Sequence, residues 1–522
     1  MLRPFLRHAF RRSAAAARPA PLPRRSGHAL ILGISIAAGA SYLSVHQRLH
    51  ADTNEQRPSD DDWAKRDPQG LPPPGELTKP ALHETDDPGD TLRSRVVEIE
   101  SHPDLGITYM EGFSLERQGR AFDFANWPNE DQVSRAIAPL PGGHHWLFMG
   151  IFDGHNGNAT SMLLSLILPT AVLGALADLY SKHARLSQPV DVDDGVEHQV
   201  DAPLESSGPV HPPAEEIDQT IKEAFLRVDD DIVHWAAERA LSGPPDGRAQ
   251  DLLAPALSGS CALLGFLDTD SRELHMALTG DSRAVLGRPV VDSAGKRRWK
   301  VLELTQDQNA HNEREMARME GEHPGETIGA NGRVMGWGMA RAFGDAAYKW
   351  SRDLQKRLFE DYLCDYPRPN VKTPPYFTAE PEITTTHVQS GDVLVMASDG
   401  LWDCLTNEEV VGLVGVWLEK HSESEVHHPQ HDIVSSAHES TQKDVIERDE
   451  LPVVEMKPDY TKMYPWWHAQ KRFINVDDTV TAHLARNALG GANVNLTSAL
   501  LHIAPPRTRR YRDDISMIVV LF

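Results

Sequence analysis

The sequence predicts an α+β fold, because short apolar segments typical of β-strands occur together with two long segments typical of helices. The chain has 522 residues, and the part from about residue 96 onward is long enough to bury a large hydrophobic core. The predicted strands are residues 146–152, 260–266, 274–279, 284–287, 393–398 and 515–522.

The two predicted helices differ in their hydrophobic pattern. Residues 215–241 place apolar side chains at helical spacing with acidic residues on the other face, which indicates a helix with one face on the core. The apolar positions are Ile217, Ile221, Phe225, Val228, Ile232 and Trp235. Residues 159–180 are nearly all apolar, but the stretch 162–177 is short for a membrane span and contains Pro169. We therefore expect the helix over residues 159–180 to be a core helix packed on a sheet.

Acidic residues lie at the ends of several predicted strands. Asp153 follows the strand 146–152 and begins Asp-Gly-His-Asn-Gly, in which glycine allows a sharp turn and leaves backbone carbonyls open to a ligand. The order strand then Asp-Gly recurs at Asp399, Asp281 follows another strand after one glycine, and Asp513-Asp514 precede the last strand. Each of these alone is more typical of an ordinary turn. Four in one chain make the interpretation as ordinary turns strained.

The residue types at these positions favour binding of a hard cation, magnesium or manganese, because such ions prefer oxygen ligands. The three cysteines, Cys261, Cys364 and Cys404, are too scattered for a zinc site, and none has an arginine at the spacing of a cysteine-dependent phosphatase. The sequence has no GxxxxGK[ST] phosphate loop, and Arg352-Asp353 lacks the His and Asn of a kinase catalytic loop. Thiol catalysis and ATP-dependent phosphoryl transfer are therefore disfavoured.

Seven segments in one order make the chain resemble the metal-dependent protein phosphatase 2C (PPM) family. They are NED at 129–131, FDGHNG at 152–157, GSCA at 259–262, TGDSRAVLG at 279–287, ARAFGD at 340–345, ASDGLWD at 397–403 and RDDIS at 512–516. The resemblance implies a four-layer α-β-β-α sandwich, in which two antiparallel sheets are flanked by helices. It also implies hydrolysis of phosphoserine and phosphothreonine.

Other segments are most similar to the branch of mitochondrial pyruvate dehydrogenase phosphatases and their fungal relatives. They are DQNAHNERE at 307–315, YKWS at 348–351, LQKR at 354–357 and TPPYFTAEPE at 373–382. Many family members have a phosphate-binding arginine where this chain has Asn126, and this branch resembles the chain in having asparagine there. The resemblance implies a phosphoprotein partner, with the pyruvate dehydrogenase complex as the candidate.

The resemblance also implies the roles of the acidic residues. Asp153 would bridge two ions of magnesium or manganese, with the Gly154 carbonyl and Glu130 completing the ligands of one ion. Asp399 and Asp513 would hold the other ion. Asp281 and Asp403 would correspond to a weaker third metal site.

A shared water, acidified between the two ions, would attack phosphorus in line. His155 is the predicted general acid for the alkoxide leaving group, and the alternative is an imidazole that bonds a turn carbonyl. For Arg341 we favour a structural ion pair with Asp345 or a neighbouring acid over a role in positioning substrate or acid. Trp402 and Phe343 are predicted core aromatics.

The N-terminal region has the composition of a targeting sequence. Residues 1–51 contain eight arginines, no lysine and no acidic residue, which predicts a mitochondrial presequence over about 1–25, with a basic tail as the alternative. Residues 26–48 include an uncharged apolar stretch that is a candidate single transmembrane segment, although it is near the lower length limit. The competing secretory anchor is disfavoured, since three scattered cysteines do not suggest an oxidised scaffold.

The rest of the chain divides into a predicted flexible linker over 51–95 and a phosphatase domain over 96–522. Polar stretches near 185–214 and 420–452 are predicted surface insertions in that domain. The expected location is the inner mitochondrial membrane, with the catalytic domain in the matrix or the intermembrane space. The sequence does not distinguish between the matrix and the intermembrane space.

Net charge excludes one class of partner. The chain carries a formal charge of −24, and without the eight N-terminal arginines 44 basic residues remain against 76 acidic ones. Nucleic-acid binding is therefore not expected. Two functions stay open: an active serine/threonine phosphatase, for pyruvate dehydrogenase or another mitochondrial substrate, and an inactive PPM-like binding protein. The presence of Glu130, Asp153, Asp399 and Asp513 favours the enzyme.

Overall fold

The computed structural model describes residues 92, 95–115, 130–140, 144–186, 211–245, 247–425, 445–503 and 507–522. The predicted presequence (1–25) and transmembrane segment (26–48) lie outside the described residues, as does nearly all of the linker. Asn126 and the central parts of both predicted insertions also lie outside them.

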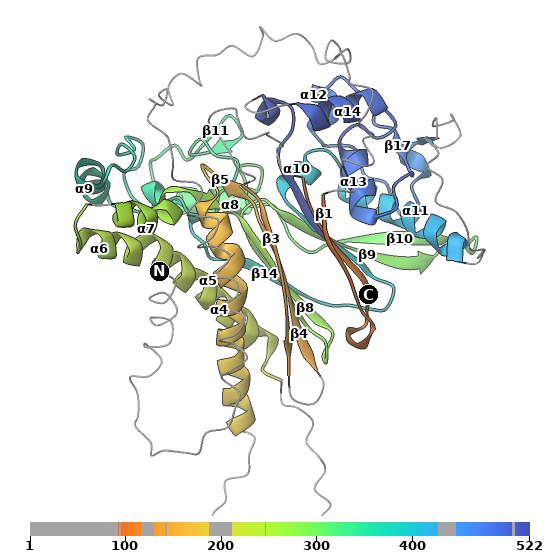
Figure 1. Cartoon of the computed structure of the whole chain (residues 1–522), viewed down its shortest axis with the longest axis horizontal. Coiled ribbons are helices and arrows are strands. Elements are labelled where there is room, and N and C mark those ends of the chain that lie inside the picture. The colour runs from red at the N-terminus through yellow and green to blue at the C-terminus, as the bar shows by residue number, and fades with distance from the viewer. Residues whose placement is uncertain are drawn as a thin grey trace, which may run out of the picture. The chain divides into compact units, whose positions relative to one another are not determined.

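Two antiparallel sheets form the centre of the predicted domain over 96–522 (Figure 1). The first has the order β1-β2-β18-β15-β9-β10, formed by Val96–His102, Ile107–Leu115, Ile515–Leu521, Val393–Ala397, Arg283–Val291 and Arg297–Glu303. The second has the order β14-β8-β7-β4-β3, formed by Glu382–His387, Glu273–Thr279, Ala262–Asp268, His145–Phe152 and Gln132–Pro139. Every neighbouring pair in both sheets is antiparallel, as predicted.

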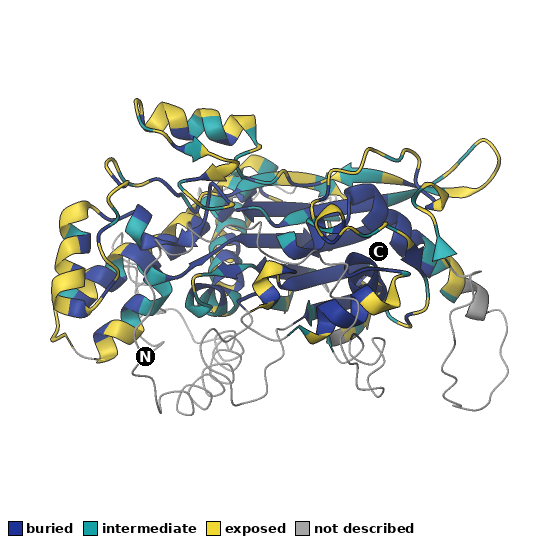
Figure 2. Cartoon of the chain, turned by 90° about the horizontal axis from the view of Figure 1, so that it is seen from above, coloured by how far each residue is buried: buried dark blue, intermediate teal, exposed yellow. Residues whose placement is uncertain are grey.

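A buried apolar core joins the facing sides of the two sheets. One cluster takes residues from both sheets, among them Met110, Met149, Ile151, Met276, Leu286, Leu394 and Ile518. The strands around it are buried (dark blue in Figure 2). Side chains of the two inner faces therefore pack against each other, as in a sheet-on-sheet sandwich.

Helices cover the outer face of the second sheet. They are α4 (Ala159–Leu186), α5 (Ala214–Asp230), a π-helical turn (Asp231–Trp235), α6 (Ala236–Leu241) and α7 (Gly247–Leu257). Leu164, Leu168 and Val172 of α4 are fully buried in one cluster with Phe148 and Phe266 of the sheet. Among the described residues, α4 is long and apolar enough to cross a membrane by length and composition alone. Its packing on the sheet agrees with the predicted core helix.

A second group of helices covers the outer face of the first sheet. It contains α10 (Asp399–Trp402), α11 (Asn407–Glu425), α12 (Met463–Trp466), α13 (Val480–Ala488) and α14 (Val494–His502). Leu413 of α11 and Leu484 of α13 share a buried cluster with Val395 and Val519 of the sheet. The α+β class predicted from the sequence is therefore confirmed, with helices on the outer side of each antiparallel sheet.

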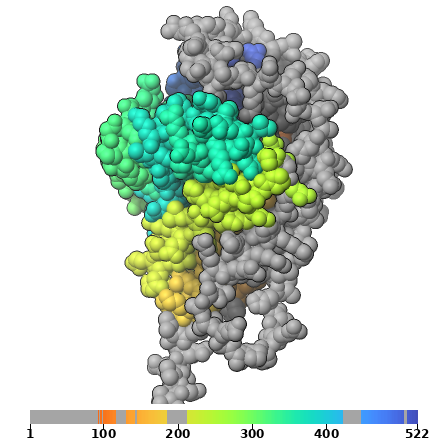
Figure 3. Space-filling view, turned by 90° about the vertical axis from the view of Figure 1, so that its left-hand side faces the viewer, coloured from red at the N-terminus to blue at the C-terminus, as the bar shows by residue number. Residues whose placement is uncertain are grey.

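The segment between β10 and β14 forms a separate lobe of short elements. It contains α8 (Glu313–Glu322), the hairpin β11–β12 (Gly329–Ala330 and Arg333–Val334) and α9 (Arg352–Tyr362). Figure 3 shows this lobe in green and teal beside the yellow-green helices α5 to α7. Trp350 Nε1 donates to the Val233 carbonyl (2.9 Å), and Tyr362 Oη donates to the Gly243 carbonyl (3.0 Å). Trp350, which belongs to the segment YKWS quoted above, therefore helps to attach this lobe.

Two predicted boundaries differ from the structure. The predicted strand 260–266 is interrupted at Cys261, because β6 (Gly259–Ser260) belongs to a small sheet with β5 (Gly154–His155) and β13 (Phe343–Gly344). In the predicted insertion 420–452, the first residues continue α11 to Glu425. Its last residues form β16 (Val445–Ile446), which pairs with β17 (Phe473–Ile474), so both ends of this stretch are regular structure.

Candidate metal centre

The loop after β4 makes a tight turn around Gly154. The Asp153 carbonyl accepts a hydrogen bond from the Cys261 N–H (2.8 Å), which fixes the loop on the start of β7. A Cβ at Gly154 would lie 2.3 Å from the Glu130 carbonyl oxygen and 2.6 Å from Ser161 Oγ. The glycine is therefore required by close backbone approach. Gly157 has a φ of 108°, which turns the chain toward α4.

Glu130 joins three of the predicted motifs. Its Oε1 accepts from the Gly157 N–H (2.7 Å), and its carbonyl accepts from Ser161 Oγ (2.5 Å). Its own N–H lies 3.4 Å from Asp514 Oδ2, and its other carboxylate oxygen pairs with Arg509. Glu130 is therefore attached both to the loop that carries Asp153 and to the segment that leads into β18.

The predicted metal-ligating aspartates lie within electrostatic reach of one another. Burial raises the pKa of Asp153 well above its usual value, and the carboxylates of Asp131, Asp399, Asp513 and Asp281 raise that pKa further. The pKa of Asp399 is raised in the same way, with Asp403 among its causes. The structure thus brings together the side chains of four different strand ends. A divalent cation among them would remove the repulsion and favour their ionised forms.

The donor set fits magnesium or manganese, because it consists of carboxylate and carbonyl oxygens. Within the described residues, no group of three or more His, Cys, Asp or Glu side chains is arranged to hold a metal ion by itself. Magnesium usually keeps several waters and takes only one or two carboxylates, so a closed protein cage is not what this ion requires.

The two residues predicted for a third metal site are engaged by neighbours. Asp281 Oδ1 accepts a hydrogen bond from Cys261 Sγ (3.2 Å). Asp403 Oδ1 lies 2.9 Å from Lys462 Nζ. Both aspartates lie beside Asp399, whose pKa they raise.

The predicted general acid, His155, pairs with a carboxylate and not with a turn carbonyl. Its Nε2 lies 2.6 Å from Asp345 Oδ2, and its ring lies 5.0 Å from the Trp337 ring. Burial lowers the pKa of His155, but the carboxylates of Asp345 and Asp281 outweigh that effect and raise it. A Cβ at Gly259 would lie 2.1 Å from His155 Nε2, so the absence of a side chain there makes room for the ring.

Asp345 is held by its backbone as well as by His155. Its N–H donates to the Ser258 carbonyl (2.9 Å), and its φ of 46° lies in the left-handed region. The sequence predicted Asp345 only as one candidate partner of Arg341. Its pairing with His155 was missed, although both residues lie in segments that were singled out.

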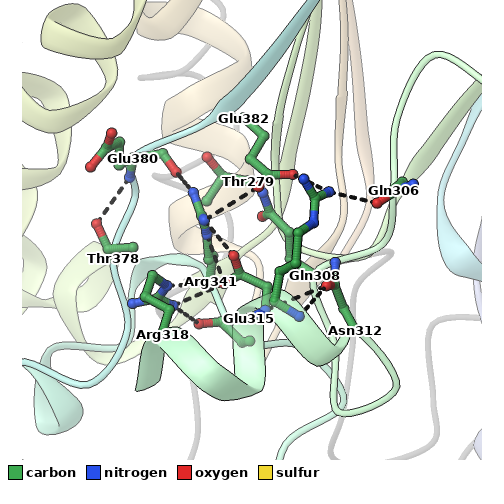
Figure 4. A network of polar contacts seen from close by, with 12 residues as sticks. Thr279, Gln306, Gln308, Asn312, Glu315, Arg318, Arg341, Thr378, Glu380 and Glu382 are labelled. Carbon is green, nitrogen blue, oxygen red and sulfur yellow. Dashed lines mark hydrogen bonds and ion pairs between the residues drawn. The ribbon is translucent and has the colours of Figure 1, made fainter. Parts of the chain in front are cut away.

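Arg341 forms the predicted structural ion pair, but its partner is Glu315 on α8 and not Asp345. Arg341 Nε donates to Glu315 Oε2 (2.8 Å), its Nη2 pairs with the other carboxylate oxygen, and its Nη1 donates to the Glu380 carbonyl (2.7 Å). Figure 4 shows the guanidinium between these groups, with Arg318 on the other side of Glu315. Arg341 therefore links α8 to the chain that enters β14.

Two further acids of the centre were not given roles from the sequence. Asp131 and Asp514 are both nearly completely buried, and burial and the Asp514 carboxylate raise the pKa of Asp131. Each is adjacent to a predicted ligand in the motifs NED and RDDIS, which is the signal that could have identified it. Trp402 and Phe343 are buried, which agrees with their prediction as core aromatics.

Comparison with known proteins gives one family. The family model described as protein phosphatase 2C matches residues 131–432. A protein phosphatase 2C homolog of Schizosaccharomyces pombe is 36% identical over 402 residues, which cover 76% of this chain and 78% of the relative.

Two further relatives are named pyruvate dehydrogenase (acetyl-transferring) phosphatase 1, mitochondrial. The protein of Saccharomyces cerevisiae is 34% identical over 398 residues, which cover 72% of this chain and 62% of the relative. The protein of Rattus norvegicus is 31% identical over 445 residues, which cover 76% of each chain. With the family match and these relatives, the chain belongs to the protein phosphatase 2C family of metal-dependent serine/threonine protein phosphatases.

Proposed function

We propose that this phosphatase acts in mitochondria and removes phosphate from serine or threonine of the pyruvate dehydrogenase complex. The substrate assignment is supported by the similarity to two relatives named for that activity, at 34% and 31% identity. The arginine-rich N-terminal region supports the compartment. The competing substrate is another mitochondrial phosphoprotein, since the S. pombe relative is named only as a protein phosphatase 2C homolog.

We assign the two principal metal positions to the acids predicted from the sequence. Asp153, the Gly154 carbonyl and Glu130 would hold one ion of magnesium or manganese, and Asp399 and Asp513, together with Asp153, would hold the second. The support is their common electrostatic cluster and the contacts of Glu130 with the Asp153 loop. When bound, the ions supply an acidified water positioned for attack on phosphorus.

His155 donates a proton to the serine or threonine oxygen as the phosphoester bond breaks. Such a donor is worth about 10²–10⁴-fold in rate, because an alkoxide is a poor leaving group. The carboxylate of Asp345, 2.6 Å from Nε2, accepts the Nε2–H and turns Nδ1 away from itself. Asp345 therefore positions His155 for proton transfer from Nδ1.

The substrate assignment is tested with the full chain and two phosphorylated substrates, the pyruvate dehydrogenase complex and casein, at equal phosphate concentration. Phosphate release is measured with Mn²⁺, with Mg²⁺ and with EDTA. We expect metal-dependent release that is faster from the dehydrogenase complex, and loss of release from both substrates in Asp153→Asn. Equal or slower release from the dehydrogenase complex would overturn the substrate assignment. Undiminished turnover in Asp153→Asn would overturn the assignment of the metal centre.

The compartment is tested by protease protection. We propose that residues 1–25 are a presequence, that 26–48 anchor the chain in the inner membrane, and that 51–95 tether the phosphatase domain. In isolated mitochondria and in mitoplasts, a domain in the matrix resists added protease in both preparations. Digestion in mitoplasts alone places the domain in the intermembrane space and removes the matrix pyruvate dehydrogenase complex as the direct substrate.

A further inference from the structure

A lysine from a distant loop contacts the metal centre on the side of Asp403. Lys462 Nζ lies 2.9 Å from Asp403 Oδ1. The N–H groups of Lys462 and of Met463 both donate to the Asp403 carbonyl, at 3.0 and 3.1 Å. Both the side chain and the backbone of this loop therefore bind the same aspartate.

The loop that carries Lys462 is fixed on buried structure. Lys471, whose side chain is 6% exposed, pairs with Asp459 (2.9 Å) and Glu409 (2.9 Å) and donates to Thr461 Oγ1 (2.8 Å). Two aromatic residues of the same segment donate to backbone carbonyls: Tyr464 to Asn487 (2.6 Å) and Trp467 to Tyr511 (2.9 Å). These contacts hold the backbone beside Asp403 on both sides of Lys462.

The ammonium of Lys462 lies in the field of several acids of the centre. Partial burial lowers the pKa of Lys462, but the carboxylates of Asp403, Asp399 and Asp281 outweigh that effect and raise it. The side chain is 68% exposed, so the ammonium faces solvent as well as the carboxylates. A divalent ion bound by Asp403 would lie next to this positive charge, and like charges a few ångströms apart repel strongly.

We propose that Lys462 is a built-in cation at the Asp281–Asp403 side of the centre and takes the place of a third metal ion. This inference rests on the proposed function, because it presupposes the two ions assigned to Asp153, Asp399 and Asp513. The ammonium balances the charge of Asp403 without a third bound metal ion. The chain therefore binds two ions tightly, and a third ion binds Asp403 only in competition with Lys462.

The inference is tested by counting bound Mn²⁺. The full chain is titrated with Mn²⁺, and free Mn²⁺ is measured by electron paramagnetic resonance. We expect two tight sites in the wild type and in Lys462→Arg, which keeps the charge. Lys462→Met should gain a third site that binds at least about tenfold more tightly than any third ion of the wild type, because the competing charge is gone. The variant Lys462→Met with Asp403→Asn should lose that site again.

Lys457→Met is the matched control. Lys457 lies on the same loop but pairs with Glu303 (2.7 Å) and Glu408 (3.5 Å), so its removal should leave two tight Mn²⁺ sites. A third site of equal affinity in the wild type and Lys462→Met would overturn the inference, as would two sites in both. Because Mn²⁺ binding is measured directly, a third tight site that appears only in Lys462→Met supports the role of Lys462 even if the pyruvate dehydrogenase complex is not the substrate. A wild type that binds no Mn²⁺ would overturn the proposed metal centre and the lysine inference together.

Discussion

His155 Nε2 lies 2.6 Å from Asp345 Oδ2, so a buried carboxylate holds the ring of the predicted general acid. A carboxylate only accepts, which assigns the proton of Nε2 to this bond and leaves Nδ1 as the atom that would exchange a proton with substrate in the proposed mechanism. The histidine is thus oriented by a third group, an arrangement common in acid and base catalysis.

The first prediction concerns the leaving group. His155→Gln should lower the turnover of a phosphothreonine peptide by about 10²-fold, because the alkoxide then leaves without a proton. Asp345→Asn should lower it by about tenfold, since the ring loses the charged carboxylate that orients it and supports its protonated form. Asparagine tolerates the left-handed backbone at this position, so the variant keeps the fold. Turnover is measured as phosphate release at saturating Mn²⁺.

The control substrate is 4-nitrophenyl phosphate, whose leaving group departs without protonation. Both variants should hydrolyse it within a few-fold of the wild-type rate, and the double variant should be no slower than His155→Gln on the peptide, because the two residues act as one unit. Equal losses on both substrates would show that Asp345 acts only through the structure of the site.

The second prediction concerns Gly154. Gly154→Ala places a methyl group 2.3 Å from the Glu130 carbonyl oxygen, and backbone atoms at that distance must move. The shift displaces Glu130 relative to Asp153, so we expect the Mn²⁺ concentration for half-maximal activity to rise by about 10–100-fold. Gly174→Ala is the matched control on α4, because nothing lies within 4 Å of its added Cβ. Unchanged metal dependence in Gly154→Ala would contradict the assignment.

Sequence patterns identified the acids of the centre better than their partners. Asp153, Asp281, Asp399 and Asp513 could be grouped as candidates because each lies within two residues of an apolar strand, and the structure places their carboxylates within electrostatic reach of one another. The partner of His155 is 190 residues away, and the partner of Asp403 is 59 residues away. Those pairings depend on how a left-handed turn and a distant loop pack, which no local periodicity encodes.

The same limit explains why the sequence did not identify Glu315 as the partner of Arg341 and did not show the break at Cys261. Arg341 has an acid four residues ahead in its own motif, but α8 places Glu315 against it instead. Residues 260–266 were predicted as one strand. In the structure, Ser260 pairs with Gly154 of β5 in another sheet. In both cases a tertiary contact overrides the local pattern.

The third prediction concerns the pair of Arg341 and Glu315. Their side chains are only 9% and 2% exposed, so removing Arg341 leaves the buried Glu315 carboxylate with Arg318 as its remaining ion-pair partner and the Glu380 carbonyl without the Nη1 donor. We expect Arg341→Met to lower the free energy of unfolding by about 1.5–3 kcal/mol, the range for losing hydrogen bonds to a charged group. Urea unfolding measures the loss, and a double-mutant cycle with Glu315→Leu should show that the two effects are not additive.

Activity separates this structural role from a role in substrate positioning. The partners of Arg341 are Glu315, Glu380 and Glu382, none of which is a predicted metal ligand. Folded Arg341→Met should therefore hydrolyse 4-nitrophenyl phosphate with a KM close to that of the wild type. A large rise in KM with unchanged stability would favour substrate positioning instead.

The last prediction is a pH dependence of stability that comes from His483. This residue of α13 is fully buried, and burial lowers its pKa from 6.5 to about 4, with partial compensation by Asp477. Below pH 6.5 the unfolded chain takes up a proton that the folded chain refuses until about pH 4. The free energy of unfolding therefore falls as the pH is lowered through this window, by about 2 kcal/mol at pH 5 from this group alone.

His483→Gln removes the titrating group and keeps a polar side chain. Urea unfolding at pH 7.5 and pH 5 should show a smaller loss of stability for the variant than for the wild type, by about 2 kcal/mol. The cost of repacking around glutamine is present at both pH values, so it cancels in this difference. Equal losses in the two proteins would mean that His483 accepts its proton in the folded state, which its burial on α13 argues against.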